Sequence, residues 1–525
     1  MLARTMILIT VVAALIISPA AARPAWQEPA TATSPAVAQP ETVESLQSRI
    51  TAVVAHPRYG SAAWGIKIVS LDTGKLIFAH NAEKYFSPAS NAKLYTGALA
   101  LARLGPDFRI RTSLYSAARP DATGTLKGDL LIYGRGDPTM AARLYGGNYA
   151  AGLEPLVERV AASGVRHVEG DLLADDSYFK GPPFGSGWQW DDLQAYYGAE
   201  VSALTINDNS LDLFVKPGAR AGIPCQVTTG PVTSYVTIMN RTQTGPKGSE
   251  SRISIYRPVG ENIIYVSGRL PIDAAGPGYQ GSVAVHNPAG LFAALFKDAL
   301  ARRGITVKGR ARVIDWKYRE VTPVDFSKLI ELGFVESLPA KDIIREMMKP
   351  SQNLYAQLLL LQVGAARAYA AEAIETRAST ETIGLNAMTE FLSEVGVKKG
   401  DVLLEEGSGL SRADLITPNA TVDLLKFMRG HKWADDYQAS LPVAGVDGTL
   451  QNRMKGTVAA GNLRAKTGTL RYVNTLSGYV TTAAGERLAF SIMLNNYYNS
   501  DRGVSPREDI DSIAVMLAGF TGKSQ

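Results

Sequence analysis

Apolar residues near the two ends of the chain follow the periods of regular helices and strands. Leu94, Ala98 and Leu101 recur at i, i+4 and i+7 after Ser90, and Gly105 ends the pattern, which predicts an amphipathic helix. The same reasoning predicts further helices at residues 341–348, 353–364, 379–395 and 418–430, strands at residues 63–71, 75–80, 463–469, 475–481 and 487–494, and a closing helix with Ile510, Ile513, Ala514 and Leu517 on one face.

The middle of the chain, residues 107–322, has a different pattern. Short β-branched runs alternate with Gly and Pro turns, which predicts one or two mostly β modules with strands at residues 128–133, 210–215, 251–256 and 263–266. Insertion at a surface loop is tolerated, and chain termini often lie close together. We therefore expect an α+β fold in which residues 45–110 and 331–525 form one domain, with helices packed on an antiparallel sheet built from the early hairpin and the late strands. Residues 111–330 would be a large insertion into it.

The first residues are typical of an export signal. Arg4 precedes an apolar stretch at residues 6–17, and Ala20-Ala21-Ala22 is a small-residue cleavage site, so residues 1–22 are interpreted as a signal peptide. The alternative is an uncleaved anchor, although the stretch is shorter than the ~20 residues of a membrane span. Residues 23–44, rich in Pro, Ala and Thr, are expected to be a tether. The sequence thus predicts export across the inner membrane into the periplasm and leaves peripheral membrane contact open.

Composition argues against several classes of binding site and cofactor. The chain has 525 residues, of which 46% are hydrophobic and 20% charged, with a net charge of +5, and no basic block marks a nucleic-acid groove. The lone Cys225 allows no internal disulfide and no cysteine-based metal site, and the five histidines lie far apart, so we expect no metal. Cys225 itself is expected to be a small core or loop residue. Oligomeric state stays open.

Three short motifs indicate nucleophilic catalysis. In chain order they are Ser90-Asn91-Ala92-Lys93, Ser351-Gln352-Asn353 and Lys466-Thr467-Gly468, the S-x-x-K, S-x-N and K-T-G set of penicillin-recognising serine enzymes. Ser90 and Lys93 are one helical turn apart, so their side chains face the same way. Lys93 can act as a base only if its pKa falls by roughly 3 units, which burial and a second cation, Lys466, would favour.

Each motif also has a structural interpretation without catalysis. A second S-x-x-K, from Ser177 to Lys180, shows that the pattern occurs by chance, but it lies in a Gly/Pro-rich stretch rather than at the start of an amphipathic helix. Ser351 alone would be an ordinary helix N-cap. Lys466 and Gly468 alone would be a solvent-facing strand lysine and a turn glycine. The three motifs in order, each in its expected context, favour catalysis.

Beyond the three motifs, the chain resembles a known family. It contains Gly134-Arg135-Gly136-Asp137-Pro138-Thr139, Asp175-Asp176-Ser177-Tyr178-Phe179, Trp188-Gln189-Trp190-Asp191-Asp192 and Gly407-Ser408-Gly409-Leu410-Ser411-Arg412. From residue 45 to its end it is similar to the low-molecular-mass class C penicillin-binding proteins of the D-alanyl-D-alanine carboxypeptidase/endopeptidase group. That resemblance implies a serine β-lactamase-like transpeptidase domain with a large insertion. The group usually has Asp where this chain has Glu406, a departure we expect to be tolerated.

The resemblance also implies roles for individual residues. Ser90 would be the acylated nucleophile, Lys93 its base, Ser351 the proton relay to the leaving amine, and Asn353 a holder of the substrate's peptide. Lys466, Thr467 and Thr469 would bind the terminal carboxylate of D-alanine, and Gly468 would let the substrate backbone approach closely. The backbone N–H groups of Ser90 and Thr469 would form the oxyanion hole. Asp192, with Tyr197 nearby, would reach the substrate's side-chain amine, and Arg412 would lie beside the site.

The function expected from these residues is that of an exported serine DD-peptidase. It would cleave the D-Ala–D-Ala end of peptidoglycan stem peptides, and the same site could cut D-alanyl–diaminopimelyl cross-links. β-Lactams would acylate Ser90 and inhibit it, and no cofactor is implied. Two alternatives stay open: a β-lactamase or esterase on the same machinery, and a non-catalytic cell-wall binding protein.

Overall fold

The computed structural model describes residues 40–370, 378–498 and 505–524. The predicted signal peptide and all but the end of the predicted tether lie outside these residues. Glu41–Gln525 form one compact unit. Its first helix, α1 (Val43–Val54), starts inside the segment assigned to the tether, where Thr42 caps it by accepting from Ser45 N.

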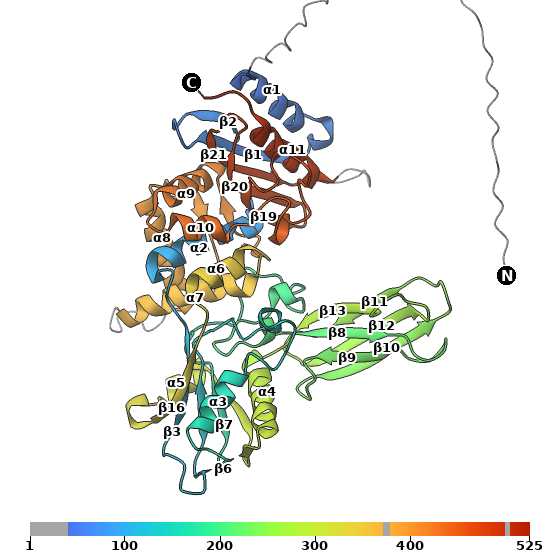
Figure 1. Cartoon of the computed structure of the whole chain (residues 1–525), viewed down its shortest axis with the longest axis vertical. Coiled ribbons are helices and arrows are strands. Elements are labelled where there is room, and N and C mark those ends of the chain that lie inside the picture. Colours follow the sequence, from blue (N-terminus) through green and yellow to red (C-terminus); the bar gives the residue numbers. More distant parts are fainter. Residues whose placement is uncertain (1–39, 371–377, 499–504, 525) are drawn as a thin grey trace, which may run out of the picture. The chain divides into compact units, whose positions relative to one another are not determined.

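A five-stranded antiparallel sheet joins the two ends of the chain, as expected. Its order is β19-β20-β21-β1-β2, and Figure 1 shows blue and red strands side by side in it. β1 pairs with β21 along its whole length, from Ala63 opposite Asn495 to Ser70 opposite Leu488. The strands are β1 (Ala63–Ser70), β2 (Leu76–His80), β19 (Arg464–Leu470), β20 (Val473–Thr481) and β21 (Arg487–Asn495).

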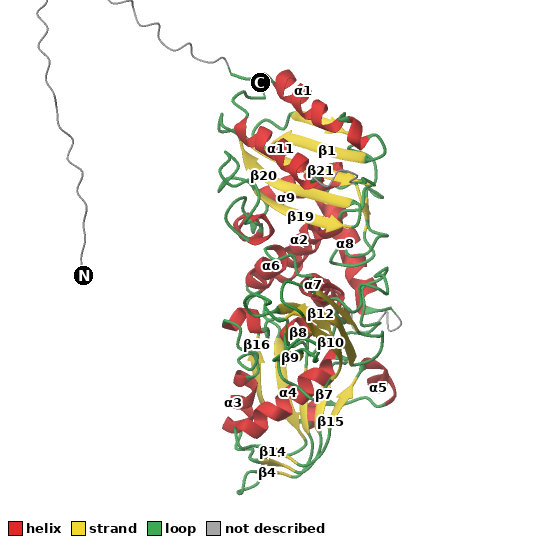
Figure 2. Ribbon diagram, turned by 90° about the vertical axis from the view of Figure 1, so that its right-hand side faces the viewer, coloured by secondary structure: helices red, strands yellow, loops and turns green. Residues whose placement is uncertain are grey.

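Helices cover both faces of this sheet. On one face, α1 and α11 (Pro506–Gly519) share a core with strand residues such as Ile66 and Phe490, and Figure 2 shows α11 lying across the strands. On the other face, α2 (Ala92–Leu104) and α9 (Pro418–Gly430) belong to a second core. That core continues into α6 (Ala340–Met348), α7 (Asn353–Ala370), α8 (Thr380–Val395) and α10 (Ala434–Ser440).

The predicted apolar faces are the buried ones. Leu94, Ala98 and Leu101 of α2 are fully buried, and Gly105 ends the helix at φ +83°. α7 covers the helix predicted at residues 353–364 and continues to Ala370, and residues 353–365 are buried. Among the described residues, no helix combines the length and apolarity that crossing a membrane requires.

The middle of the chain contains more helix than expected. A mixed sheet, in the order β15-β7-β5-β3-β16, has parallel β5–β7 and β7–β15 pairs. It carries α3 (Glu154–Ala162) and α4 (Pro288–Arg302), which the prediction of mostly β modules missed. The remaining elements here are β3 (Arg111–Ser116), β4 (Thr125–Leu126), β5 (Leu130–Tyr133), β6 (His167–Val168), β7 (Leu172–Asp175), β14 (Thr306–Val307), β15 (Ala311–Ile314), β16 (Ile330–Glu336) and α5 (Trp316–Val321).

Six further strands form two three-stranded sheets, which we call the sandwich. One sheet has the order β13-β8-β9 and the other β10-β12-β11, and they form the green arm of Figure 1. Residues such as Leu213 and Val266 lie in their shared core. Cys225 is buried there too, which confirms its prediction as a small core residue. The strands are β8 (Ser210–Lys216), β9 (Gln226–Gly230), β10 (Thr237–Gly245), β11 (Arg252–Tyr256), β12 (Ile263–Pro271) and β13 (Tyr279–Ala284).

Candidate active site

Ser90 and Lys93 meet at the start of α2. Ser90 lies in a single 3-10 turn (Ala89–Asn91) that leads directly into the helix. Lys93 is fully buried, and its Nζ lies 2.9 Å from Ser90 Oγ. Ala89, just before the serine, has a left-handed φ of +47°, a conformation rare for alanine. The turn therefore holds the serine in a defined and partly strained position beside the lysine.

The ammonium of Lys93 also contacts two other segments. It donates to Asn353 Oδ1 at 2.6 Å and to the Ser408 carbonyl at 2.7 Å. Asn353 is the last residue of the second motif, so the first two motifs, some 260 residues apart in sequence, meet directly. With Ser90, these acceptors saturate the three donors of an ammonium group.

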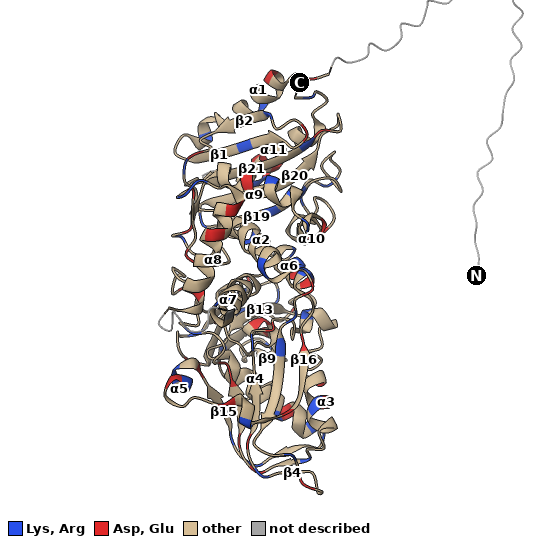
Figure 3. Ribbon diagram, turned by 90° about the vertical axis from the view of Figure 1, so that its left-hand side faces the viewer, with Lys and Arg blue, Asp and Glu red and all other residues tan. Residues whose placement is uncertain are grey.

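Burial lowers the pKa of Lys93 to about 7, while the buried carboxyl groups of Glu406 and Asp414 oppose the shift. Lys466 is fully buried too, and its pKa is held well below its usual range, first by burial and then by the charge of Lys93. Repulsion between two ammonium groups acts on both of them. The two lysines come from α2 and β19, whose basic positions are blue in Figure 3.

Lys466 connects the second motif to the third. Its Nζ donates to Ser351 Oγ at 2.8 Å and to the Thr467 carbonyl at 2.9 Å. Ser351 lies two residues before α7 and has a φ of +69°, so the cap position belongs to Gln352, whose carbonyl accepts from Ala356 N. The N-cap interpretation of Ser351 is therefore wrong, and its hydroxyl faces a catalytic-type lysine instead.

A buried acidic pair supports the loop behind Lys93, and sequence reasoning missed its importance. The Glu406 carboxylate is fully buried and accepts backbone N–H groups of Ser408 (2.7 Å), Leu410 (2.9 Å) and Gly409. This fixes the loop so that the Ser408 carbonyl meets Lys93. Asp414 lies beside Glu406, and burial together with that second carboxyl raises the pKa of Asp414 well above its usual value. Glu406 appeared in sequence only as a departure from a family pattern, which carries no sign of this role.

The third motif lies on an edge strand. β19 is the outermost strand of its sheet, and Ala465 N–H donates outward to the Pro442 carbonyl. Because strand N–H groups alternate, those of Thr467 and Thr469 point to the same outer edge. The Thr467 hydroxyl donates to Thr449 Oγ1 at 2.7 Å, whereas Thr469 is exposed and donates to Asn474 Oδ1 at 3.2 Å.

The structure adds a reason for Gly468 to the expected one. A Cβ at this position would lie 2.2 Å from Thr475 Oγ1 and 2.6 Å from the Pro88 carbonyl. The glycine thus lets β19 lie against the turn that carries Ser90. Its absent side chain makes room for Thr475 and for the Pro88–Ala89 segment of the protein itself.

Asp192, Tyr197 and Arg412 lie together. The Tyr197 side chain hydrogen-bonds the half-buried Asp192, and burial raises the pKa of that carboxyl while Arg412 opposes the rise. Arg412 donates to the Arg471 carbonyl, in the turn after β19, at 3.0 Å. These three residues are connected to the second motif, because Asn353 Nδ2 donates to the backbone carbonyl of Tyr197 at 2.8 Å.

The second S-x-x-K has no such arrangement. Ser177 lies in a turn, where its own backbone N–H donates to Asp175 Oδ1. Lys180 Nζ donates to Glu320 at 2.5 Å and lies over the Trp316 ring. The structure therefore distinguishes the two copies as the sequence context did.

Comparison with known proteins identifies the family of this chain. The D-Ala-D-Ala carboxypeptidase 3 (S13) family profile matches residues 46–518. The chain belongs to this family. It is 37% identical over 506 residues to the D-alanyl-D-alanine carboxypeptidase of Actinomadura sp. (strain R39), which covers 93% of this chain and 88% of the relative. It is 27% identical over 443 residues to the D-alanyl-D-alanine carboxypeptidase DacB of Haemophilus influenzae, covering 82% of this chain and 85% of that one.

A solved structure agrees with the S13 assignment. The crystal structure of penicillin binding protein 4 (dacB) from Haemophilus influenzae matches with a TM-score of 0.73 and 25% identity, covering 89% of this chain and 97% of that one. The expected penicillin-binding fold is confirmed. This S13-family chain is a serine-type D-Ala-D-Ala carboxypeptidase.

Proposed function

We propose that Ser90 is the residue acylated during the reaction and that Lys93 is its general base. The observation that carries this assignment is the 2.9 Å contact between Lys93 Nζ and Ser90 Oγ, made by a lysine whose pKa burial lowers to about 7. Near neutral pH a large fraction of this amine is uncharged and can take the hydroxyl proton. As the Oγ–carbonyl bond forms, a tetrahedral intermediate develops next to the N-terminal end of α2.

The other motif residues complete the cycle. The D-Ala–D-Ala amide bond breaks when a proton passes to the leaving nitrogen, and Ser351, held by Lys466 at 2.8 Å, is placed to relay it. The N–H groups of Ser90 and Thr469 stabilise the oxyanion, a contribution typically worth about 10² to 10³ in rate per donor. Water then hydrolyses the Ser90 ester and restores the hydroxyl.

Substrate recognition uses the edge of β19 and the Asp192 group. An extended stem peptide can add to the open edge of the strand, with Asn353 holding its peptide group and Lys466, Thr467 and Thr469 holding its terminal carboxylate. Asp192 and Tyr197 receive the substrate's side-chain amine, and Arg412 positions Asp192 electrostatically. The carboxylate of Asp192 is supported for this task by the hydroxyl of Tyr197.

The proposal extends to four finer points. β-Lactams acylate Ser90 because they present the same acyl carbonyl, and the same site opens D-alanyl–diaminopimelyl cross-links as an endopeptidase. Residues 1–22 direct export, so the enzyme acts in the cell envelope. The catalytic domain is formed by residues 45–110 and by the chain that follows β16; because β16 (Ile330–Glu336) pairs with β3 in the insertion's sheet, the expected boundary at residue 331 moves to residue 337.

D-Alanine release from a soluble stem pentapeptide tests the proposal. Ser90→Ala should lose at least about 10³-fold in kcat/KM, whereas Ser177→Ala, the serine of the second S-x-x-K, should keep wild-type activity. A cross-linked muropeptide dimer assayed in parallel tests the endopeptidase step. Activity retained by Ser90→Ala would overturn the assignment, and rapid turnover of penicillin would favour a β-lactamase.

A further inference from the structure

The outer sheet of the sandwich presents a face that the proposed reaction does not use. Along β10, β12 and β11, alternate residues point into the sandwich core, as Ile264 and Val266 do, or away from it. The outward set, which we call the tyrosine–arginine face, consists of Met239, Arg241, Gln243, Arg252, Ser254, Tyr256, Tyr265, Ser267 and Arg269.

Strand register places the two tyrosines in one row. Tyr265 pairs with Met239 on one side and Tyr256 on the other. The two rings are stacked, with centroids 6.1 Å apart and planes 29° apart, and Tyr256 is 51% exposed. The guanidinium of Arg241 lies 5.1 Å from the Tyr265 ring. This row is a flat aromatic platform open to solvent, of the kind on which a sugar ring can lie.

The charge on this face has one sign. Arg241, Arg252 and Arg269 are exposed, and β10, β11 and β12 contain no Asp or Glu. In the part of the chain that the structure describes, none of these arginines forms an ion pair. A cluster of like charges without carboxylate partners favours an anionic ligand. The sequence shows no basic block here because the arginines gather across neighbouring strands rather than along the chain.

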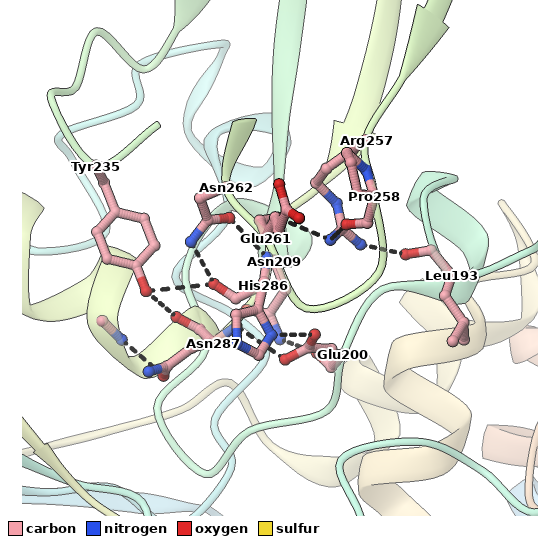
Figure 4. Close-up of polar contacts among 11 residues, drawn as sticks. Leu193, Glu200, Asn209, Tyr235, Arg257, Pro258, Glu261, Asn262, His286 and Asn287 are labelled. Carbon is pink, nitrogen blue, oxygen red and sulfur yellow. Dashed lines mark hydrogen bonds and ion pairs between the residues drawn. The ribbon is translucent and has the colours of Figure 1, made fainter. Parts of the chain in front are cut away.

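The face is connected to the loop that carries Asp192. Arg257 follows β11 directly, and its buried guanidinium donates to the carbonyls of Leu193 (2.6 Å), Pro258 (2.9 Å) and Glu261 (3.0 Å), as Figure 4 shows. Leu193 is the neighbour of Asp192. These bonds tie the end of β11 to the segment next to the proposed amine site.

Glu200 makes a second attachment nearby. Its buried carboxylate contacts His286 Nδ1 and accepts from Asn287 N, both at 2.8 Å, just after β13 ends (Figure 4). Asn262, in the loop that leads into β12, donates to the His286 carbonyl at 2.9 Å. The sandwich is thus joined at two places to the chain between Asp192 and Asn209.

We propose that the tyrosine–arginine face binds the peptidoglycan of the cell wall through its sugar rings and its free carboxylates, so that one molecule holds the polymer whose stem peptides it cleaves. This rests on the proposed function, which supplies the polymer. Sugar rings would stack on Tyr256 and Tyr265, and carboxylates of the polymer would meet the arginines. Holding the same polymer at a second point raises the effective concentration of stem peptides at Ser90.

Cosedimentation with purified, insoluble wall sacculi tests the face, with Ser90→Ala as the parent protein so that the wall is not consumed. Arg241→Glu/Arg269→Glu should weaken binding about tenfold, and more at low than at high ionic strength. Tyr256→Thr, which retains a strand-forming residue, should weaken it several-fold. Arg119→Glu/Lys127→Glu, an equal charge change at exposed sites outside the sandwich, should leave it unchanged.

Two readouts separate this inference from the proposed reaction. With Ser90 intact, both face variants should keep the wild-type kcat/KM on a soluble stem peptide and its melting temperature. Sacculi stripped of stem peptides should still bind. Equal wall binding by parent and face variants would overturn the inference, and so would face-dependent binding of a single-stranded oligonucleotide or of phosphatidylglycerol vesicles in place of the wall. Absence of activity on the soluble stem peptide in the wild-type protein would instead count against the proposed function.

Discussion

At the scale of single residues, the site contains two fully buried lysines with different partners. Lys93 faces Ser90, Asn353 and a carbonyl, whereas Lys466 faces Ser351 and its neighbour's carbonyl. Both lose hydration, and repulsion from Lys93 lowers the pKa of Lys466 further. The pair therefore favours a state in which at least one amine is uncharged, which is what a base next to a serine needs.

The pH profile of acylation follows from the pKa of Lys93. The lowered pKa of about 7 means that the amine is uncharged above that value and protonated below it. Acylation by a β-lactam should therefore rise about tenfold per pH unit up to near pH 7 and level off above it. Stopped-flow acylation between pH 5 and pH 9 measures this. Lys93→Met should abolish the reaction, and a flat wild-type profile would show that another group is the base.

The sequence pointed to the residues proposed for catalysis more readily than to those that support them. Ser90, Lys93, Ser351, Asn353 and Lys466 were recognisable because their residue types and order match a known motif set, and the structure brings them together. The role of Glu406 was not, because accepting backbone N–H groups leaves no pattern in the chain. The sequence anticipated that burial would lower the pKa of Lys93, but not that Glu406 and Asp414 oppose the shift, since that depends on segments distant in sequence meeting.

At the scale of elements, β19 and the Ser90 turn must approach each other closely. Gly468 allows this, because Thr475 Oγ1 and the Pro88 carbonyl occupy the space of a side chain. The approach of β19 to the Ser90 turn therefore depends on the absence of a side chain at Gly468, where Thr475 Oγ1, the Pro88 carbonyl and the Ala89 methyl group lie close.

Gly468→Ala should move β19 away from the turn that carries Ser90. The overlap should lower the free energy of unfolding by about 1–3 kcal/mol and slow acylation of Ser90 at least about tenfold, because the oxyanion donors move apart. Thermal melting and labelling with a fluorescent penicillin measure the two effects. Gly430→Ala, at the end of α9 where a Cβ would meet nothing within 4 Å, is the matched control and should change neither. A Gly468→Ala protein with normal acylation would contradict this account of the glycine.

Helices were predicted correctly where a single apolar face with helical spacing packs against a single hydrophobic core. α2, α6, α8, α9 and α11 were anticipated because their apolar residues recur at helical spacing. α4 was missed although Asn287 caps it, Pro288 occupies its first turn and Phe292 and Phe296 lie on its buried face. Those signals were present and were outweighed by the surrounding strand-like runs. The parallel pairing of β5 with β7 could not be predicted locally, since it depends on which distant strands meet.

At the scale of the whole molecule, long-range pairing holds the catalytic part together and the sandwich is attached to the substrate side. β1 and β21, more than 400 residues apart, pair along eight registered positions. Arg257 ties the sandwich to Leu193, next to Asp192. The sandwich is thus linked to the segment that carries Asp192, the residue we propose to receive the substrate's side-chain amine.

Arg257→Met should uncouple the sandwich from the segment that carries Asp192. Removing the guanidinium frees the Leu193 carbonyl and loosens Asp192, so KM for a stem peptide with a free side-chain amine should rise roughly fivefold, equivalent to ~1 kcal/mol. Acylation by penicillin, which lacks that amine, should keep its wild-type rate. Steady-state kinetics and penicillin labelling compare the two. Equal loss in both assays would mean that Arg257 only stabilises the fold.

The identity of the acylated residue is the central claim, and mass spectrometry of the penicillin-treated protein tests it most directly. The purified protein is incubated with a fluorescent penicillin, digested, and the labelled peptide sequenced, with Ser90→Ala and Ser177→Ala in parallel. We predict a stable adduct on Ser90 that is absent from Ser90→Ala and unchanged in Ser177→Ala. An adduct elsewhere, or labelling that survives in Ser90→Ala, would contradict the assignment of Ser90 and of the lysine beside it.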